Sequence, residues 1–198
     1  MGKVIYIEKF NKIGGRQMKK NNIIRYDRQT IELLAHDILE SYDISKIPVD
    51  PVAIANNLGI KVYAENFEIY NGDKVSGAII KHENGNIEIL VNESDSYERQ
   101  RFTVAHELGH LFLHIKNSSK YERVDMHRAT GYGTIIPQEV EANNFAAALL
   151  MDKDTLFKKF IIANEFGIVG TACIDYLANL FGVSKQAMEY RLRNIGLI

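Results

Sequence analysis

The chain has 198 residues, of which 46% are hydrophobic and 25% are charged, and its formal net charge at pH 7 is −1. Such a length suits one medium domain with or without a small appendage, and the composition is typical of a globular protein. A net charge near zero gives no overall field that would attract nucleic acid or an anionic membrane, and no apolar run approaches the roughly 20 residues that a membrane-spanning helix needs. The single cysteine, Cys173, excludes an internal disulfide and a cysteine-based metal site, and it favours a reducing, cytoplasmic location.

The chain is predicted to have three parts. Its first 20 residues are rich in Lys and Arg and contain only a short apolar patch, so residues 1–26 are predicted to be a loosely ordered leader, with Met18 as an alternative start. The main domain is predicted over residues 27–165. Residues 166–198 are predicted to form a C-terminal helical segment packed on that domain.

The first half of the main domain alternates from helix to strand. Helical spacing of apolar residues predicts a helix from Asp27 to Tyr42, and Asp50-Pro51 and Gly59 mark the two ends of a short second helix. An Asn71-Gly72 turn and a stronger hairpin signal at Asn84-Gly85 separate strand patterns. These strand patterns cover residues 59–63, 75–80 and 86–91. Strands flanked by helices favour an α+β fold with a small antiparallel or mixed sheet packed on helices.

The second half is predicted to be mainly helical. A helix is expected over residues 94–115, with Ser94 or Asp95 as its N-cap. Another helix is expected over residues 137–151, with proline at its first position. Residues 116–136 lack periodicity and predict a long loop. Asp125 and His127 in this loop could approach a metal ion, but we favour solvated loop residues because neither has helical phasing.

The sequence His106-Glu107-Leu108-Gly109-His110 contains the pattern H-E-x-x-H. On a helix, His106 and His110 lie one turn apart on one face, so both imidazoles can reach a single ion. Glu107 lies about 100° round the helix, where it can act on a water without being a ligand. The helix is otherwise largely apolar, and burying two imidazoles without partners would be costly, which favours a ligand role. His114 is about 12 Å along the helix from His106, too far to share the ion, and is predicted to support the site or to pack.

A third ligand is expected on the helix over residues 137–151. A catalytic zinc site has three protein ligands and an open position, and two imidazoles with a carboxylate favour Zn²⁺ over Mn²⁺. Glu139 and Glu141 are the candidates, although acidic residues in a first helical turn are also stabilised by the helix dipole alone. We favour Glu139, because it shares a face with Asn143, whose amide could orient a ligand histidine, whereas Glu141 shares a face with Phe145.

These motifs resemble those of the ImmA/IrrE family, gluzincin-type metallopeptidases of bacteria and their mobile elements. The similarity runs from about Asp27 to the C-terminus and is carried by Arg99 to His110, His114 and Glu139 to Met151, together with Ser76-Gly77-Ala78 and the strand ending at Asn92. It departs from the family at Asp152, where a proline is usual. The resemblance implies a zincin-like domain, one Zn²⁺ held by His106, His110 and Glu139, and Glu107 as general base. It also implies a protein substrate, typically a helix-turn-helix repressor that is cut at a limited site so that transcription is released.

The C-terminal segment has the pattern of a helix-turn-helix. Helices are predicted over residues 171–181, capped by Thr171, and 184–193, capped by Ser184. In a DNA-binding interpretation the contacts would be Lys185, Gln186, Tyr190, Arg191 and Arg193. Between Thr171 and Ile198 the sequence has only three basic residues and two acidic ones, so its net positive charge is small. Direct DNA binding is therefore not favoured over packing or substrate recognition.

Three functional hypotheses follow. The leading one is a cytoplasmic zinc endopeptidase, in which the strand over residues 75–80 is an edge strand that aligns an extended substrate. The second is a DNA-associated regulator with a structural or sensing metal site. The third is a toxin–antitoxin type partner that binds its cognate protein without cutting it. Glu107 favours the first, because a structural site would not need it.

Overall fold

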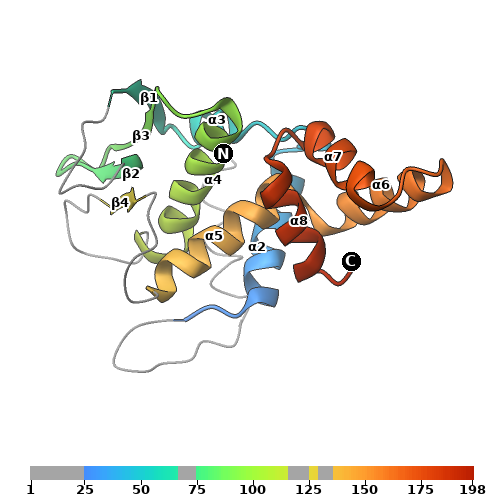
Figure 1. Ribbon diagram of the computed structural model, residues 1–198. Helices are drawn as coiled ribbons and strands as arrows, with labels where there is room; N and C mark the ends of the chain where they lie inside the picture. Colours follow the sequence, from blue (N-terminus) through green and yellow to red (C-terminus); the bar gives the residue numbers. More distant parts are fainter. Residues whose placement is uncertain (1–24, 67–74, 116–124, 129–135) are drawn as a thin grey trace.

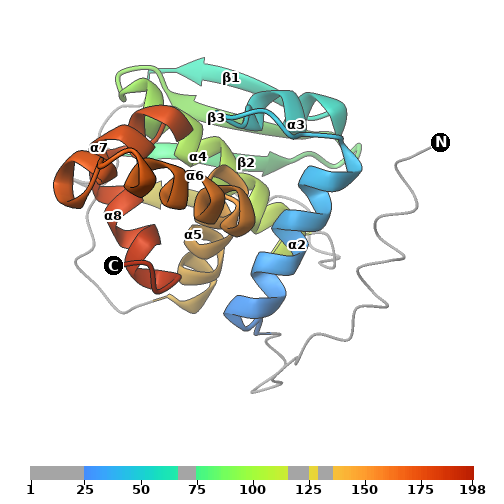
Figure 2. The same ribbon diagram turned by 90° about the vertical axis from the view of Figure 1, so that its right-hand side faces the viewer.

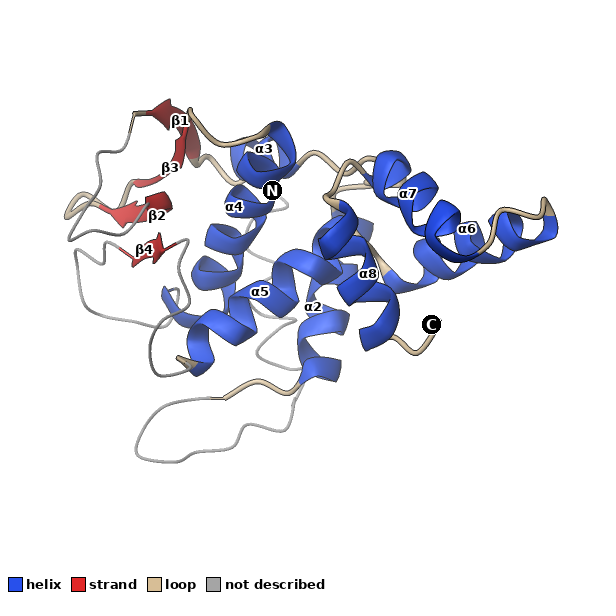
Figure 3. Cartoon of the chain, in the orientation of Figure 1, coloured by secondary structure: helices blue, strands red, loops and turns tan. Residues whose placement is uncertain are grey.

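The computed structural model describes residues 25–66, 75–115, 125–128 and 136–198 (Figure 1). Its fold class is α+β, as predicted. Figures 1 and 3 show the strands gathered at one side of the molecule and the helices at the other. None of the helices in the described ranges is long and apolar enough to cross a membrane.

Within the described residues, two helices precede the sheet, as predicted. Helix α2 covers Arg28–Ser41, and its N-cap, Asp27, accepts a hydrogen bond from the backbone N–H of Thr30 at 2.8 Å. Helix α3 covers Pro51–Asn57 and is capped in the same way by Asp50. Tyr26, a residue of the predicted leader, is buried.

The sheet is mixed and has the order β1-β3-β2-β4. The strands are β1 Lys61–Glu65, β2 Val75–Lys81, β3 Ile87–Asn92 and β4 Asp125–Arg128. Strand β1 runs parallel to β3, whereas β2 is antiparallel to both β3 and β4. The predicted hairpin is present between β2 and β3, where Gly85 has a φ of +84° that suits glycine. In Figure 2 the sheet lies along one side of the molecule, with the helices beneath it.

Two predictions about the strands were wrong. Residues 116–136 are not a loop throughout, because residues 125–128 form β4. Strand β2 is therefore not an edge strand, since β4 pairs with its outer side along Val75 to Ile79. Four residues in a polar sequence give no period-two signal, so this strand depends on the partner it finds in the fold. The predicted Asn71-Gly72 turn lies outside the described residues.

The central helix is divided into two parts. Helix α4 covers Tyr97–His110 and continues as one π-helical turn, η1, over Leu111–Ile115. Its N-cap is Ser96, rather than Ser94 or Asp95 as predicted. Ser94 bonds instead to the side chain of Asn92 at the end of β3.

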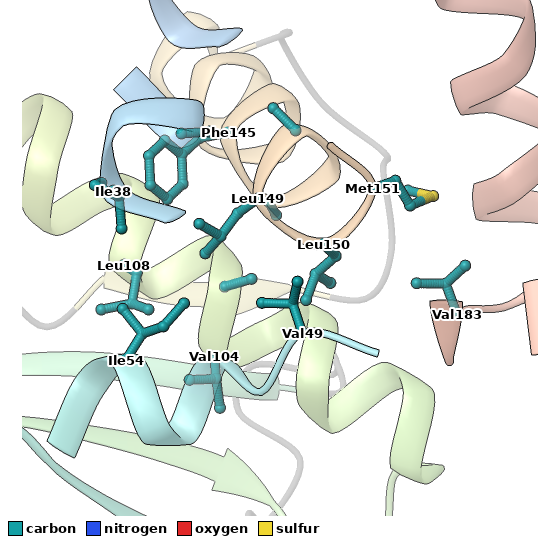
Figure 4. Close-up of a cluster of buried hydrophobic side chains, with 14 of the residues drawn as sticks. Ile38, Val49, Ile54, Val104, Leu108, Phe145, Leu149, Leu150, Met151 and Val183 are labelled. Atoms are coloured by element: carbon teal, nitrogen blue, oxygen red, sulfur yellow. The ribbon is translucent and has the colours of Figure 1, made fainter. Parts of the chain in front are cut away.

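Helix α5 covers Pro137–Leu150, begins beside the C-terminal end of α4 and runs back towards its N-terminal end. Figure 4 shows side chains from α2, α3, α4 and α5 meeting in a shared core. Members of this core that are at most 1% exposed include Ile38, Ile54, Val104, Leu108, Phe145 and Leu149. The core thereby fixes α4 and α5 relative to each other.

Asp152, which follows the last residue of the predicted helix over residues 137–151, has a structural role. Asp152 caps helix α6, Lys153–Glu165, by accepting hydrogen bonds from the backbone and hydroxyl of Thr155. It also lies 3.0 Å from Nδ1 of His36 on α2. The bond to Asp152 raises the pKa of His36. Burial raises the pKa of Asp152, but the bonds from Thr155 and His36 outweigh burial and lower it.

The C-terminal segment consists of α7, Gly170–Phe181, and α8, Lys185–Asn194, joined by a tight turn. Gly182 in this turn has a φ of +61°, and Ser184 caps α8 as predicted. The prediction that Thr171 caps α7 was wrong. The helix begins at Gly170 and has no side-chain cap.

Two buried arginines attach this segment to the main domain. Arg101 on α4 donates to the backbone carbonyls of Phe181 and Gly182, which fall at the C-terminal end of α7, and burial lowers its pKa. Arg191 on α8 bonds to the carboxylate of Glu32 and to the carbonyl of Met151. Arg191 is only 3% exposed and is unavailable for the DNA contact that the helix-turn-helix pattern suggested.

Candidate metal centre

The two motif histidines converge on one point. His106 and His110 are 0% and 1% exposed, and their Nε2 atoms are 2.9 Å apart. Both lie on α4 one turn apart, as the H-E-x-x-H spacing predicts.

Glu139 completes the cluster from the first turn of α5. Its carboxylate oxygens lie 3.2 Å from Nε2 of His106 and 3.3 Å from Nε2 of His110. The three possible ligand atoms all lie within 4.8 Å of one another. Of the two glutamates considered from the sequence, Glu139 is therefore the one that faces both imidazoles.

Asn143 lies one turn after Glu139 and contacts the other ring nitrogen of His106. Its Oδ1 is 2.9 Å from Nδ1 of His106. An amide oxygen accepts only, so this contact assigns the proton of the imidazole to Nδ1 and leaves the lone pair on Nε2 facing Glu139. Asn143 thus has the geometry expected from the sequence.

His110 is supported by a chain of two further residues. Its Nδ1 lies 3.1 Å from Nδ1 of His114, and Nε2 of His114 lies 3.0 Å from Oε2 of Glu141. A carboxylate accepts, so Nε2 of His114 carries the proton; its Nδ1 then accepts from Nδ1–H of His110. These two hydrogen bonds leave the lone pair of His110 on Nε2, just as the contact with Asn143 leaves the lone pair of His106 on Nε2.

Glu141 thus has a place that the sequence reasoning missed. It was considered only as an alternative ligand, yet it is 6% exposed and bonds to His114. Its other oxygen accepts from the backbone N–H of Tyr26 at 3.3 Å and lies 3.9 Å from Arg25. The available signal was the third histidine, four residues after His110, together with a second glutamate on α5.

Gly109 allows the two site helices to approach each other. A Cβ at this position would lie 3.1 Å from both Cα and O of Ala142 and 3.2 Å from Cβ of Phe145. These distances are shorter than ordinary van der Waals contact, so a side chain would push α5 away from α4. The glycine inside the motif is therefore part of what brings Glu139 to the histidines.

The remaining candidate residues from the sequence lie on α4 and β4. Glu107 is 0% exposed and lies on α4 next to His106. The backbone of Asp125 and His127 belongs to β4. Among the residues whose side chains are described, the metal-type cluster comprises His106, His110 and Glu139.

The electrostatics of the cluster suit a cation. With both ring protons on Nδ1, two nitrogen lone pairs and a carboxylate meet within about 3 Å, an arrangement that repels itself unless a positive charge lies between the groups. Two imidazoles and one carboxylate are a common ligand set of catalytic zinc. The donor set therefore fits a divalent metal ion.

Comparisons with known proteins support the assignment of a metal centre to this chain. Residues 55–193 match the family described as the IrrE N-terminal-like domain, peptidase family M78. The chain is also 23% identical over 123 residues to the protein named metallopeptidase ImmA of Bacillus subtilis (strain 168). That match covers 61% of this chain and 65% of the length of ImmA. The match to the family takes in most of the chain and every residue of the cluster, so the chain belongs to the ImmA/IrrE family of metallopeptidases.

Proposed function

We propose that the protein is a zinc-dependent endopeptidase that makes a limited cut in a protein substrate. The single observation that carries this proposal is the convergence of His106, His110 and Glu139, each presenting one lone-pair atom to the same point. Membership of a metallopeptidase family supports it independently. A zincin-like assignment of the domain is part of the same proposal.

His106, His110 and Glu139 would hold the ion, and Zn²⁺ rather than Mn²⁺ is favoured by two imidazole ligands. When bound, the ion would supply Lewis acidity, which activates water and polarises a peptide carbonyl. Glu107 takes one proton from the attacking water as the new C–O bond forms. Glu107 then gives that proton to the amine nitrogen as the C–N bond breaks, so that one peptide bond and one water become a carboxylic acid and an amine.

The surrounding hydrogen bonds hold the ligands in their binding form. Asn143 keeps the proton of His106 on Nδ1, and the His114–Glu141 pair does the same for His110. A carboxylate at the end of such a chain also makes the ligand imidazole more basic. His114 and Glu141 are therefore positioning residues in this proposal.

The proposed substrate is a helix-turn-helix repressor in the cytoplasm. This part rests on the resemblance to ImmA/IrrE proteins and on the single buried cysteine, Cys173. A DNA-bound role is the less favoured alternative, because the exposed cations of α8 already have partners. Lys185 pairs with Asp175, and Arg193 pairs with Glu189.

The test is co-expression with each helix-turn-helix repressor that is found to be encoded in the neighbourhood of the gene. Zinc-loaded wild-type protein is expected to produce two fragments of the repressor. Glu107→Gln should retain one zinc per chain and produce none, whereas Glu165→Gln, an exposed control on α6, should cleave at the wild-type rate. Cleavage by the Glu107→Gln protein would contradict the mechanism, and failure of the wild-type protein to cut would contradict the choice of substrate.

A further inference from the structure

A groove lies beside the metal centre, between α4, α5 and α8. It has a volume of about 600 Å³. Its apolar lining is formed by Phe102, Val140, Met151, Val183, Ala187 and Tyr190. Figure 1 shows α8 alongside the C-terminal half of α5. Residues Gln186, Ala187 and Tyr190 of α8 line the groove.

The groove lies next to His106 of the metal centre, because two of its lining residues contact this histidine. Phe102 lies one turn before His106 on α4, and their ring centres are 6.5 Å apart. Asn143, which bonds to His106, itself lines the groove. The groove then runs to Ser96 at the start of α4, about 15 Å along the helix from His106, which equals four or five residues of extended chain.

The chemistry of the groove suits a polypeptide with a large apolar side chain. Val140 is 44% exposed and Tyr190 is 63% exposed, so apolar surface is open on both sides. Ala147 and Ala187 leave space between them where larger side chains would fill it. Asn144 and Gln186 add side-chain amides, which can donate to and accept from backbone peptide groups.

The walls of the groove are held rigidly. On α4, Arg99 donates two hydrogen bonds to the hydroxyl of Ser76 and a third to Asp95. On the opposite side, α8 is fixed by the part-buried bonds of Arg191 to Glu32 and by its buried bonds to the carbonyl of Met151. A preformed groove binds an extended chain with less loss of entropy than a mobile surface does.

We propose that this groove is the substrate-binding cleft for a polypeptide segment that carries a large apolar residue within about five residues of the cut bond. The helix pair α7–α8 then recognises substrate through the N-terminal half of α8. This inference rests on the proposed endopeptidase function, because the peptidase centre is what gives the groove its occupant.

The first experiment measures binding without cleavage. The probe is fluorescein-labelled β-casein, an unfolded polypeptide, added to the Glu107→Gln protein and followed by fluorescence anisotropy. Ala187→Trp, which fills the groove, should weaken binding at least tenfold, and Tyr190→Ala should weaken it about threefold. The matched control is Ala172→Trp, the same change at an exposed alanine of α7 outside the groove, which should stay within twofold.

Tyr190 is mostly exposed, so its variant decides the result if Ala187→Trp fails to fold. Wild-type affinity in the Tyr190→Ala protein and in a folded Ala187→Trp protein would overturn the proposal. Zinc content should be one per chain in every variant, because none of these positions touches the metal centre.

The second experiment reads the cleavage preference. Zinc-loaded protein digests a tryptic peptide library, and the products are sequenced by mass spectrometry. An apolar residue should be enriched within five residues of the cut, and Ala187→Trp should lose that enrichment. Cleavage that does not depend on the groove would overturn this inference and leave the proposed function intact. Casein binding that depends on the groove, without any cleavage, would contradict the proposed function and would leave the groove only as a polypeptide-binding site.

Discussion

Glu141→Gln tests the role of the residue that supports the metal centre from furthest away. In the wild-type protein the Glu141 carboxylate accepts from Nε2 of His114 at 3.0 Å, and His114 in turn contacts His110. Glutamine keeps the size and one acceptor oxygen but removes the charge. A charge-assisted hydrogen bond contributes about 1.5–3 kcal/mol and a neutral one about 0.5–1.5 kcal/mol. The midpoints of these ranges differ by about 1.3 kcal/mol, which predicts zinc affinity that is roughly eightfold weaker.

The assay is competition for zinc with a chromophoric chelator. The control is Glu32→Gln, because it also removes a carboxylate from an ion pair, that with Arg191, at a site remote from the metal. The control is expected to lower the melting temperature and leave the zinc affinity unchanged. Glu141→Gln should lower the zinc affinity at a similar or smaller cost in stability.

A double variant sharpens the test. His114→Phe removes the whole support of His110 and should weaken zinc binding by about 10- to 100-fold. Adding Glu141→Gln to it should change nothing further, because both act through one hydrogen-bonded chain. Zinc affinity of the Glu141→Gln protein within twofold of wild type, or additive effects in the double variant, would refute the reasoning.

Three further outcomes are expected. Gly109→Ala should weaken zinc binding and lower the free energy of unfolding by about 1 kcal/mol, because the overpacking cost of about 1–3 kcal/mol exceeds the gain of up to about 1 kcal/mol in helix propensity. Wild-type zinc affinity in this variant would contradict the close packing of α4 and α5. Arg191→Met should lower the free energy of unfolding in urea by about 3 kcal/mol, since it leaves Glu32 without its partner; a change below 1 kcal/mol would show that the pair is not structural. The stability advantage of wild type over His36→Gln should be greatest between about pH 4 and pH 6.5. It should shrink above pH 6.5 as His36, whose pKa is raised, loses its proton, and below pH 4 as Asp152, whose pKa is lowered, gains one; melting temperatures that differ equally at pH 5 and pH 9 would contradict this.

Among the described residues, most helices and three of the four strands could be predicted because their signals are local. Capping residues such as Asp27, Asp50 and Ser184 bond to backbone groups within three residues, and Asn84-Gly85 needs only its own turn geometry. Strand β4 could not be predicted. Its pairing with β2 joins residues about 50 positions apart in the sequence, and nothing in its four residues, three of which are polar, specifies that partner.

In the candidate site, too, the local features could be predicted from the sequence and the long-range contacts could not. The H-E-x-x-H spacing fixes His106 and His110 relative to each other, because helix geometry alone sets the distance. Glu139 could be chosen over Glu141 from a helical-face argument about Asn143, and the structure has Asn143 at 2.9 Å from His106. The sequence shows the third histidine and the second glutamate, but their contact also depends on the crossing of two helices at Gly109, which helix periodicity alone does not specify.

The C-terminal segment illustrates how a motif can mislead about exposure. Arg191 falls at a position where a helix-turn-helix pattern suggests a DNA contact, yet Glu32 lies 159 residues earlier and binds it inside the fold. Charge counting in the segment alone could not detect this pairing. In the fold, α8 of this segment forms one wall of the groove beside the metal centre.

The central claim is that one zinc ion is held by two histidines of α4 and one glutamate of α5. X-ray absorption at the zinc edge tests it most directly, because multiple scattering counts the imidazoles bound to the metal. The claim predicts one zinc per chain with two imidazoles and oxygen ligands, and loss of one oxygen ligand or of the zinc itself in Glu139→Ala. A third imidazole, which would make His114 a ligand, or an unchanged spectrum in Glu139→Ala, would contradict it.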